Sequence, residues 1–500
     1  MVTNKLSANE DYIKMKIDSE KTKNTEISMN KLSINEALTQ MSIGSLTSEK
    51  MLKQALIRID QNSDRHAFIT VDREGALKQA THCDSLRTKS EYIGPLHGII
   101  IAIKDNIHVA GLPNTAGTPA FSNFIPSEDS PVIGRLKKAG AIIIGKTNMH
   151  ELAYGITSDN KAFGSVGNAI LGNYIAGGSS GGTATAVALG MAVAGLGTDT
   201  GGSVRIPASL NGLVGFRPSV GRYPSEGLTS ISHTRDTVGP IVSCVRDAQL
   251  LDTVLSGEPD KTEEISLRGL RLGVPREYFY DNIEPIIAQK TELLLAQLQD
   301  AGVELVYTDL ENIGELNAQV GFPIVLCETK KLLSAYLKLN LPTETLDSLL
   351  EKIADPNVKG IMQMAINGNI TKQVYDDVIE RIRPDMQQLY STYFTTNKVD
   401  AIIFPTTLLS ARPIKGSEET VELNGIQTPT FPTYIHNTDP ASNVGIPGLS
   451  IPLSSTAEGL PFGVEINGPI NSDRRLLAIG LQIENIIQKA MRRSIETKGE

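Results

Sequence analysis

Residues 177–207 begin Gly177-Gly178-Ser179-Ser180-Gly181-Gly182 and, after a run of small residues, end Gly197-Thr198-Asp199-Thr200-Gly201-Gly202-Ser203-Val204-Arg205-Ile206-Pro207. Glycine has no Cβ, so each Gly-Gly pair that precedes a serine lets the backbone approach a ligand or another chain segment closely. One such pair is typical of a tight turn beside a helix packed on a sheet. Two in tandem, with an apolar helix between them, favour a nucleophile, a proton relay and backbone donors for a developing negative charge.

Apolar strands surround this stretch. Gly98–Lys104 is apolar without alternation, which predicts a strand with both faces buried in a parallel sheet covered by helices. A helix from Pro131, capped by Ser130, leads to a second buried strand at Ala141–Ile144, so a right-handed βαβ unit is expected. Further strands are predicted at 192–196, 213–216, 270–274, 400–405, 449–452 and 462–466. The fold class is therefore α/β.

The organisation along the chain predicts one large domain. Residues 1–30 are polar and mixed in charge and are expected to form a flexible N-terminal extension. Residues 31–500 should form a single α/β/α domain, with its core at 45–257 and 396–490. A helical insertion at about 258–395 should shape a substrate pocket, through helices at 283–300, 322–339, 344–353 and 372–394.

Composition excludes several classes of protein. The 500 residues are 40% hydrophobic and 21% charged, with a net charge of -9 and no basic block, which argues against nucleic-acid binding. No apolar run reaches the length of a transmembrane helix. The cysteines Cys83, Cys244 and Cys327 are far apart and lack metal-type spacing, so they are expected to be reduced thiols of a cytoplasmic protein.

Lys104 is a candidate base for a serine nucleophile, although a lysine at a strand end can also be simply solvated. It stands at the carboxyl end of a strand, where open α/β sheets bind ligands. Its pKa would have to fall by about 3 units from about 10.4 to act near neutral pH. Burial among isoleucines would lower it, and Asp105 should point to the opposite side of the strand.

Two other motifs compete with this interpretation. Gly140–Thr147 matches a P-loop letter for letter, but its central residues form the predicted strand instead of a loop around phosphate. Gly177-x-Ser179-x-Gly181 fits a nucleophile elbow with His436 as the late histidine. That motif needs a strand directly before the serine, and the preceding residues 172–176 are turn-like.

The strand end Ile103-Lys104-Asp105-Asn106 and the whole of residues 177–207 resemble the amidase signature family. Family-like sequence runs from about residue 45 to the C-terminus and is weakest in the helical middle. The resemblance implies a central mixed sheet flanked by helices and an enzyme that hydrolyses a linear amide without a metal or cofactor.

The resemblance also implies the roles of individual residues. Ser203 would be the acyl-forming nucleophile, Ser179 the bridging serine on a cis peptide bond after Gly178, and Lys104 the base. The expected oxyanion hole consists of the backbone N–H groups of Thr200, Gly201, Gly202 and Ser203. The side chains expected to hold the loop are those of Asp199, Arg205 and Ser180.

Two further segments, Asn148–Ser158 and Gly221–Pro224 with Ser232–Thr237, resemble those of family members that hydrolyse indole-3-acetamide and mandelamide. They imply a small primary arylalkyl amide, with Ala153 and Tyr154 as candidate substrate contacts. Alternatively, both segments only brace the sheet. Homodimerisation is possible, and no nucleic-acid or membrane partner is expected. The alternative function is the A subunit of a glutamine-dependent amidotransferase that acts with aminoacyl-tRNA partners.

Overall fold

A mixed sheet, built from strands at both ends of the chain, forms the centre of the molecule. The computed structural model describes residues 32–259 and 263–496, which form an 11-stranded sheet and a separate two-stranded hairpin. The strands of the sheet are β1 (Phe68–Val71), β2 (Ile100–Lys104), β3 (Ile142–Thr147), β4 (Ala194–Asp199), β5 (Val214–Arg217), β6 (Thr237–Val242), β7 (Arg271–Gly273), β8 (Glu304–Val306), β9 (Ala401–Pro405), β12 (Gly448–Ser455) and β13 (Pro461–Asn467). The hairpin consists of β10 (Thr420–Leu423) and β11 (Ile426–Pro429).

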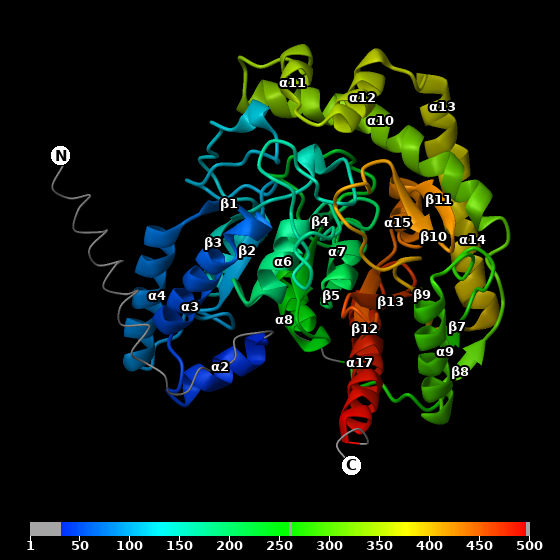
Figure 1. The fold of residues 1–500 in the computed structure, drawn as a ribbon, viewed down its shortest axis with the longest axis horizontal. Coiled ribbons are helices and arrows are strands. Elements are labelled where there is room, and N and C mark those ends of the chain that lie inside the picture. Colours follow the sequence, from blue (N-terminus) through cyan, green and yellow to red (C-terminus); the bar gives the residue numbers. More distant parts are fainter. Residues whose placement is uncertain (1–31, 260–262, 497–500) are drawn as a thin grey trace.

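The strand order is β1-β3-β2-β4-β6-β5-β12-β13-β9-β7-β8. Strands β3, β2 and β4 run parallel to one another, as do β9, β7 and β8 at the other end. The strands between these two groups pair antiparallel. The predicted α/β class, with a mixed sheet flanked by helices, is confirmed (Figure 1).

The parallel group places three polar strand ends at one edge of the sheet. All five residues of β2 are buried, as their unbroken apolar pattern predicts. Because β3, β2 and β4 are parallel, their carboxyl ends, Thr147, Lys104 and Asp199, meet at the same edge. Helix α6 approaches this group closely: a Cβ added to Gly195 of β4 would lie 2.3 Å from Thr183 Cγ2.

Helices cover the sheet and extend over one end of it. Those associated with the sheet are α2 (Ile34–Ser42), α3 (Ser48–Gln61), α4 (Arg73–Thr88), α5 (Pro131–Lys138), α6 (Gly181–Ala188), α7 (Arg205–Leu210), α8 (Val245–Ser256), α9 (Pro285–Asp300) and α17 (Asp473–Glu496). The others are α10 (Ile313–Asn340), α11 (Leu346–Lys352), α12 (Pro356–Asn367), α13 (Lys372–Asp377), the π-helical η4 (Val378–Ile382), α14 (Arg383–Asn397), α15 (Thr430–Ile435) and α16 (Asp439–Val444). Figure 1 shows α10 to α13 together at the top of the view.

Several elements differ from the sequence-based expectation. Strand β6 was not predicted, because Pro240 interrupts its apolar pattern and a proline argues against a central strand. Helix α10 begins at Ile313, nine residues before the expected start, and contains Pro323. The single helix expected at 372–394 is divided among α13, η4 and α14. Ser130 precedes α5, but its hydroxyl donates to the Glu226 carbonyl instead of capping the helix.

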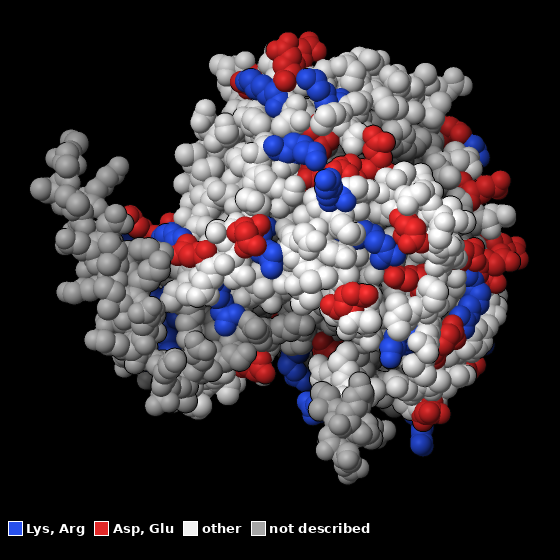
Figure 2. All heavy atoms as spheres, in the orientation of Figure 1, with Lys and Arg blue, Asp and Glu red and all other residues white. Residues whose placement is uncertain are grey.

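Three observations concern regions outside the sheet. The extension expected at residues 1–30 lies outside the described residues. On the face drawn in Figure 2, basic and acidic side chains are interspersed among the described residues. Of the helices in residues 32–259 and 263–496, none combines the length and apolarity needed to cross a membrane.

Candidate active site

Lys104 is buried and contacts Ser179. Its Nζ donates to Ser179 Oγ at 2.7 Å and to Thr198 Oγ1 at 2.8 Å. The contact with Thr198 follows from the register of the parallel pair β2–β4, in which Ile103 lies opposite Leu196. Lys104 is therefore held within the protein and is not a solvated strand end.

The charge of Lys104 is disfavoured at this position. Burial lowers the pKa of its ammonium group to about 7, although the charges of Asp199 and Asp236 act to raise it. In the described residues no carboxylate lies within ion-pair distance of Lys104. A large fraction of Lys104 is therefore neutral near pH 7 and can accept a proton.

Asp105 points away from Lys104 and pairs with Lys146. The distance from Asp105 Oδ1 to Lys146 Nζ is 3.0 Å, and both side chains are fully buried. Lys146 also donates to Asn114 Oδ1 at 3.0 Å, and it lies within β3 together with Gly145. The residues that match a P-loop therefore form a strand, and their lysine belongs to a buried ion pair. This arrangement excludes the loop geometry of a phosphate site.

Ser179 follows a cis peptide bond to Gly178. The preceding Gly177 has a φ of +76°, and a Cβ there would lie 2.8 Å from Pro207 Cα of α7, so this position requires glycine. Ser180 joins the two glycine-rich loops: its N–H donates to the Ser203 carbonyl at 3.2 Å and its hydroxyl to the Thr198 carbonyl at 3.2 Å.

Ser203 lies at a cavity of about 660 Å³ that is lined mainly by apolar side chains. Thr200 and Gly201 line the same cavity. Within the part of the chain that the structure describes, no hydrogen bond joins the hydroxyls of Ser179 and Ser203. Ser203 is oriented by its neighbour Gly202, whose carbonyl accepts from the N–H of Ile206 at 2.8 Å in the first turn of α7.

One of the four N–H groups expected in the oxyanion hole has a partner within the loop. The N–H of Gly202 donates to Asp199 Oδ1 at 2.8 Å, so it is already used inside the loop. Among the described residues, the N–H groups of Thr200, Gly201 and Ser203 have no hydrogen-bond partner. Three of the four N–H groups that the resemblance implies are therefore unengaged in this geometry, and the fourth donates to Asp199.

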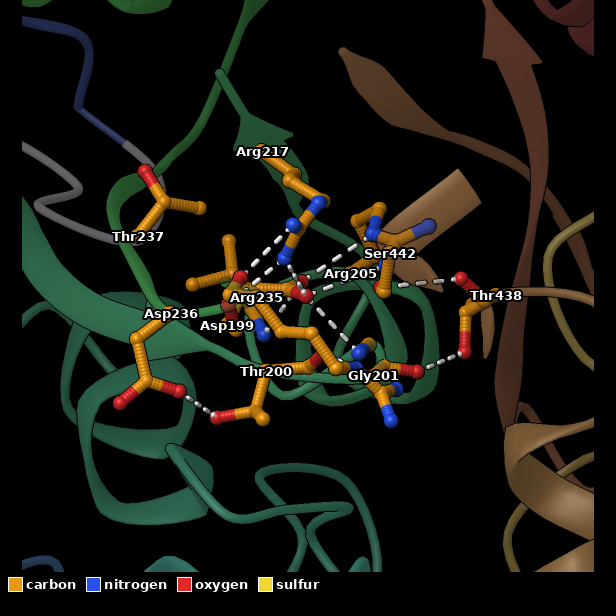
Figure 3. A network of polar contacts seen from close by, with 12 residues as sticks. Asp199, Thr200, Gly201, Arg205, Arg217, Arg235, Asp236, Thr237, Thr438 and Ser442 are labelled. Atoms are coloured by element: carbon orange, nitrogen blue, oxygen red, sulfur yellow. Dashed lines mark hydrogen bonds and ion pairs between the residues drawn. The ribbon is translucent and has the colours of Figure 1, made fainter. Parts of the chain in front are cut away.

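Asp199 anchors the loop through buried charges (Figure 3). Its carboxylate pairs with Arg205 at 3.0 Å and with Arg217 at 2.9 Å. Burial alone would raise the pKa of Asp199, but the two guanidinium groups hold it well below its usual range. Arg205 also pairs with Glu465 Oε1 of β13 at 2.5 Å, which ties the loop to the middle of the sheet.

The two candidate substrate contacts, Ala153 and Tyr154, both line the cavity. The Tyr154 hydroxyl hydrogen-bonds Thr329 of α10, so this wall is joined to the helical segment. Other parts of α10 and α12 contribute Phe322, Val325 and Ile361.

His436 lines the cavity but is engaged elsewhere. Its ring stacks on Tyr278, with 3.9 Å between ring centroids, and its Nδ1 lies 2.9 Å from Asn437 Oδ1. Residues 172–176 form isolated bridges and no strand before Ser179. The nucleophile elbow is therefore absent from this segment.

Sequence reasoning missed most of the residues that hold the loop. Thr198 and Asn106, whose Nδ2 donates to Thr198 Oγ1 at 3.1 Å, lie inside quoted motifs but were given no role. Arg217 lies on the next strand along the chain and Glu465 on a strand 260 residues from Arg205, and only the fold brings them to Asp199 and Arg205. Among the described residues, no group of three or more His, Cys, Asp or Glu side chains could hold a metal ion.

Comparison with known proteins identifies the family. The model of the family described as Amidase matches residues 50–477. The chain is 38% identical over 457 residues to an indoleacetamide hydrolase of Allorhizobium ampelinum, and this alignment covers 91% of this chain and 98% of the relative. It is 40% identical over 489 residues to a mandelamide hydrolase of Pseudomonas putida, and this alignment covers 93% of this chain and 94% of the relative.

A solved structure agrees with these relatives. A crystal structure of an amidase superimposes with a TM-score of 0.81 at 33% sequence identity. The superposition covers 91% of this chain and 99% of the amidase chain. The buried lysine and the paired glycine-serine loops thus lie in a chain that matches amide hydrolases over nearly its full length. The chain belongs to the amidase family.

Proposed function

We propose that this enzyme hydrolyses a small, uncharged arylacetamide-type primary amide to its carboxylate and ammonia. The observation that carries the proposal is the apolar cavity of about 660 Å³ beside Ser203 and three free N–H groups. Its relatives include an indoleacetamide hydrolase and a mandelamide hydrolase, whose names specify amides of this type.

The charges around the cavity support an uncharged substrate. Arg235 and His436 are the basic residues of the lining. The guanidinium of Arg235 is already engaged by Asp439 and by the carbonyls of Thr200 and Gly321. A glutamine side chain would bring an α-carboxylate into this cavity without a free cation to receive it, and burying an unpaired charge is costly. This argues against the amidotransferase alternative.

The mechanism proceeds through an acyl-enzyme. Ser203 Oγ attacks the amide carbonyl carbon, and its proton passes through the Ser179 hydroxyl to neutral Lys104. The N–H groups of Thr200, Gly201 and Ser203 stabilise the oxyanion. The proton from Lys104 is given to the leaving nitrogen, and ammonia departs. Water then attacks the ester, and its proton passes along the same relay to Lys104. Lys104 returns this proton to Ser203 Oγ as that oxygen leaves, and the acid product dissociates to the carboxylate.

Ammonia release from a matched panel tests the proposal. The panel contains phenylacetamide, indole-3-acetamide, mandelamide, acetamide and glutamine, each offered to the purified chain alone and to Ser203→Ala. We expect turnover of the aryl amides, little turnover of acetamide and none of glutamine. Activity restricted to glutamine, or activity that survives in Ser203→Ala, would contradict the proposal.

A further inference from the structure

The free N–H groups beside Ser203 belong to peptide planes that are held by their carbonyls. In a trans peptide bond the C=O and N–H groups point in opposite directions. A donor that fixes a carbonyl therefore also fixes the direction of the next residue's N–H. Arg217 Nη1 donates to the Asp199 carbonyl at 2.7 Å, which orients the N–H of Thr200.

The carbonyl before the Ser203 N–H accepts from the backbone of a helix, whereas the carbonyl before the Gly201 N–H accepts from a side chain. The Gly202 carbonyl, which precedes the Ser203 N–H, is held by the first turn of α7. The Thr200 carbonyl, which precedes the Gly201 N–H, accepts from Arg235 Nε at 3.1 Å. Arg235 lies in the loop before β6, outside the glycine-rich stretch, and is 3% exposed.

Three elements fix the guanidinium of Arg235. Its Nε donates to Thr200 in the catalytic loop, its Nη1 to the Gly321 carbonyl of α10 at 3.0 Å, and its Nη2 pairs with Asp439 of α16. The planar fork of arginine presents three separate nitrogens to these acceptors in fixed directions, whereas a lysine has a single compact ammonium group.

Glycines allow this guanidinium to lie against the loop. A Cβ on Gly201 would lie 3.2 Å from Arg235 Nη2 and 3.1 Å from Asp439 Oδ1. A Cβ on Gly321 would lie 3.0 Å from Arg235 Nη1. Both glycines therefore leave room for the Arg235–Asp439 pair to lie against the catalytic loop.

We propose that Arg235 is a positioning residue for amide hydrolysis: it holds the Thr200 carbonyl and so directs the Gly201 N–H into the cavity beside Ser203. The proposal rests on the proposed function, because it requires Ser203 as the nucleophile. Arg235 acts through the loop and not on the substrate, since each of its three nitrogens already has a partner in the protein. Its effect should appear in the transition state and not in substrate binding.

The test measures kcat and KM for phenylacetamide in Arg235→Gln, Arg235→Lys and the double variant Arg235→Gln/Asp439→Asn. Loss of one oxyanion donor typically costs about 10²–10³-fold in kcat, so a misdirected donor should cost about 10–100-fold with KM nearly unchanged. Arg235→Lys should resemble Arg235→Gln. The double variant also removes the carboxylate of Asp439, which the single variant leaves unpaired. If kcat recovers in the double variant, the loss of rate came from the unpaired charge of Asp439 and not from the lost Thr200 contact, and the proposal is overturned.

Two inhibitors separate positioning from a merely structural role. Phenylacetaldehyde is expected to add to the Ser203 hydroxyl, whose proton passes through Ser179 to Lys104, so that the hemiacetal oxygen carries a negative charge in the oxyanion hole. In contrast, 2-phenylethanol is expected only to fill the cavity. In the Arg235 variants the inhibition constant of the aldehyde should rise in step with the loss of kcat, and that of the alcohol should stay constant. Equal weakening of both inhibitors, or a kcat loss that follows only the folded fraction, would overturn the proposal.

Arg271→Gln is the matched control. Arg271 also donates to two backbone carbonyls, those of Lys398 and Asn397, and pairs with Glu304, but it lies on β7, next to the β8 edge of the sheet. It should change the melting temperature without changing kcat. Ser203→Ala is measured in parallel: activity in that variant would contradict the proposed function, whereas full kcat in Arg235→Gln beside an inactive Ser203→Ala would contradict only the role of Arg235.

Discussion

Lys104 Nζ lies 2.7 Å from Ser179 Oγ, while the carboxylate next to Lys104 in the chain, Asp105, pairs with Lys146 on β3. The alternation of side chains along β2 separates the two groups. As a result, one buried lysine has a carboxylate partner and the other has hydroxyls. Burial lowers the pKa of both lysines, so what distinguishes Lys104 as the candidate base is its contact with Ser179.

The pH dependence of kcat/KM should report the ionisation of Lys104. Burial lowers the pKa of Lys104 to about 7, so the neutral base is depleted below pH 7 and dominates above it. The rate should therefore rise about tenfold per pH unit below pH 7 and level off above it. Initial rates with phenylacetamide between pH 5 and 9 measure this profile. A flat profile, or a Lys104→Ala variant that retains turnover, would contradict the assignment.

Ser203 should be the residue that forms the acyl-enzyme. Replacing a serine nucleophile costs about 10⁴-fold or more in kcat, so Ser203→Ala should lose all measurable turnover. A fluorophosphonate probe should label the wild-type enzyme at Ser203, identified by mass spectrometry of its peptide. Ser180→Ala is the control and should keep the label, because its hydroxyl contacts only the Thr198 backbone. A label on Ser180, or dependence of labelling on His436, would contradict the role of Ser203.

Gly202→Ala should disrupt the catalytic loop. Gly202 has a φ of +134°, and an added Cβ would lie 2.1 Å from Thr438 Oγ1, whose hydroxyl holds the Gly201 carbonyl at 2.6 Å. Backbone strain and overpacking together should lower the free energy of unfolding by roughly 2–4 kcal/mol and abolish turnover. Urea unfolding and the rate measure the two effects.

Gly221→Ala provides the matched comparison for Gly202. Gly221 also has a positive φ, +85°, but no atom lies within 4 Å of an added Cβ. It should lose only the strain contribution, about 1 kcal/mol, and retain its rate. If the two variants unfold alike, packing against Thr438 is not the reason for glycine at position 202.

The sequence was sufficient for the parts of the fold that local pattern determines. Strands β2, β3 and β9 contain the apolar runs Ile100–Ile103, Ile142–Ile144 and Ala401–Phe404, and the burial of these runs on both faces follows from that pattern. Strand β6 carries Pro240 between β4 and β5, where propensity argues against a strand and only the surrounding sheet stabilises it. Strands β1 and β8 form the two edges of the sheet and contain no buried residue, so neither carries the apolar run that indicates a central strand.

The site shows the same division. The serines, glycines and Lys104 lie in two continuous motifs, so the sequence could indicate them. The residues that orient those motifs could not be found in this way. Arg217 and Glu465 meet Asp199 and Arg205 only through the order of strands in the sheet. The use of the Gly202 N–H inside the loop depends on local geometry that no residue type encodes.

Lys146 should serve stability and not nucleotide binding. Its pair with Asp105 is fully buried, and removal of one partner of such a pair typically costs about 3–5 kcal/mol. Lys146→Met should therefore lower the free energy of unfolding by that order, and the double variant with Asp105→Asn should recover part of the loss. ATP should not change the melting temperature of the wild-type chain. ATP-dependent stabilisation that Lys146→Met abolishes would contradict this structural role.

Phe322 of α10 and Phe431 of α15 should set the preference for aryl amides. Both line the cavity and are about half exposed, at 47% and 48%, so their rings are available to a substrate. An aromatic pair contributes about 0.5–1.5 kcal/mol beyond the area it buries, which corresponds to roughly 3- to 10-fold in affinity. Phe322→Ala and Phe431→Ala should each raise KM for phenylacetamide by that factor with kcat little changed, and should leave acetamide unaffected. Leu339→Ala, on the same helix as Phe322 but outside this cavity, is the control. If the two substitutions change KM equally for phenylacetamide and acetamide, the aryl group of the substrate does not contact Phe322 or Phe431, because acetamide has no aryl group to lose such a contact.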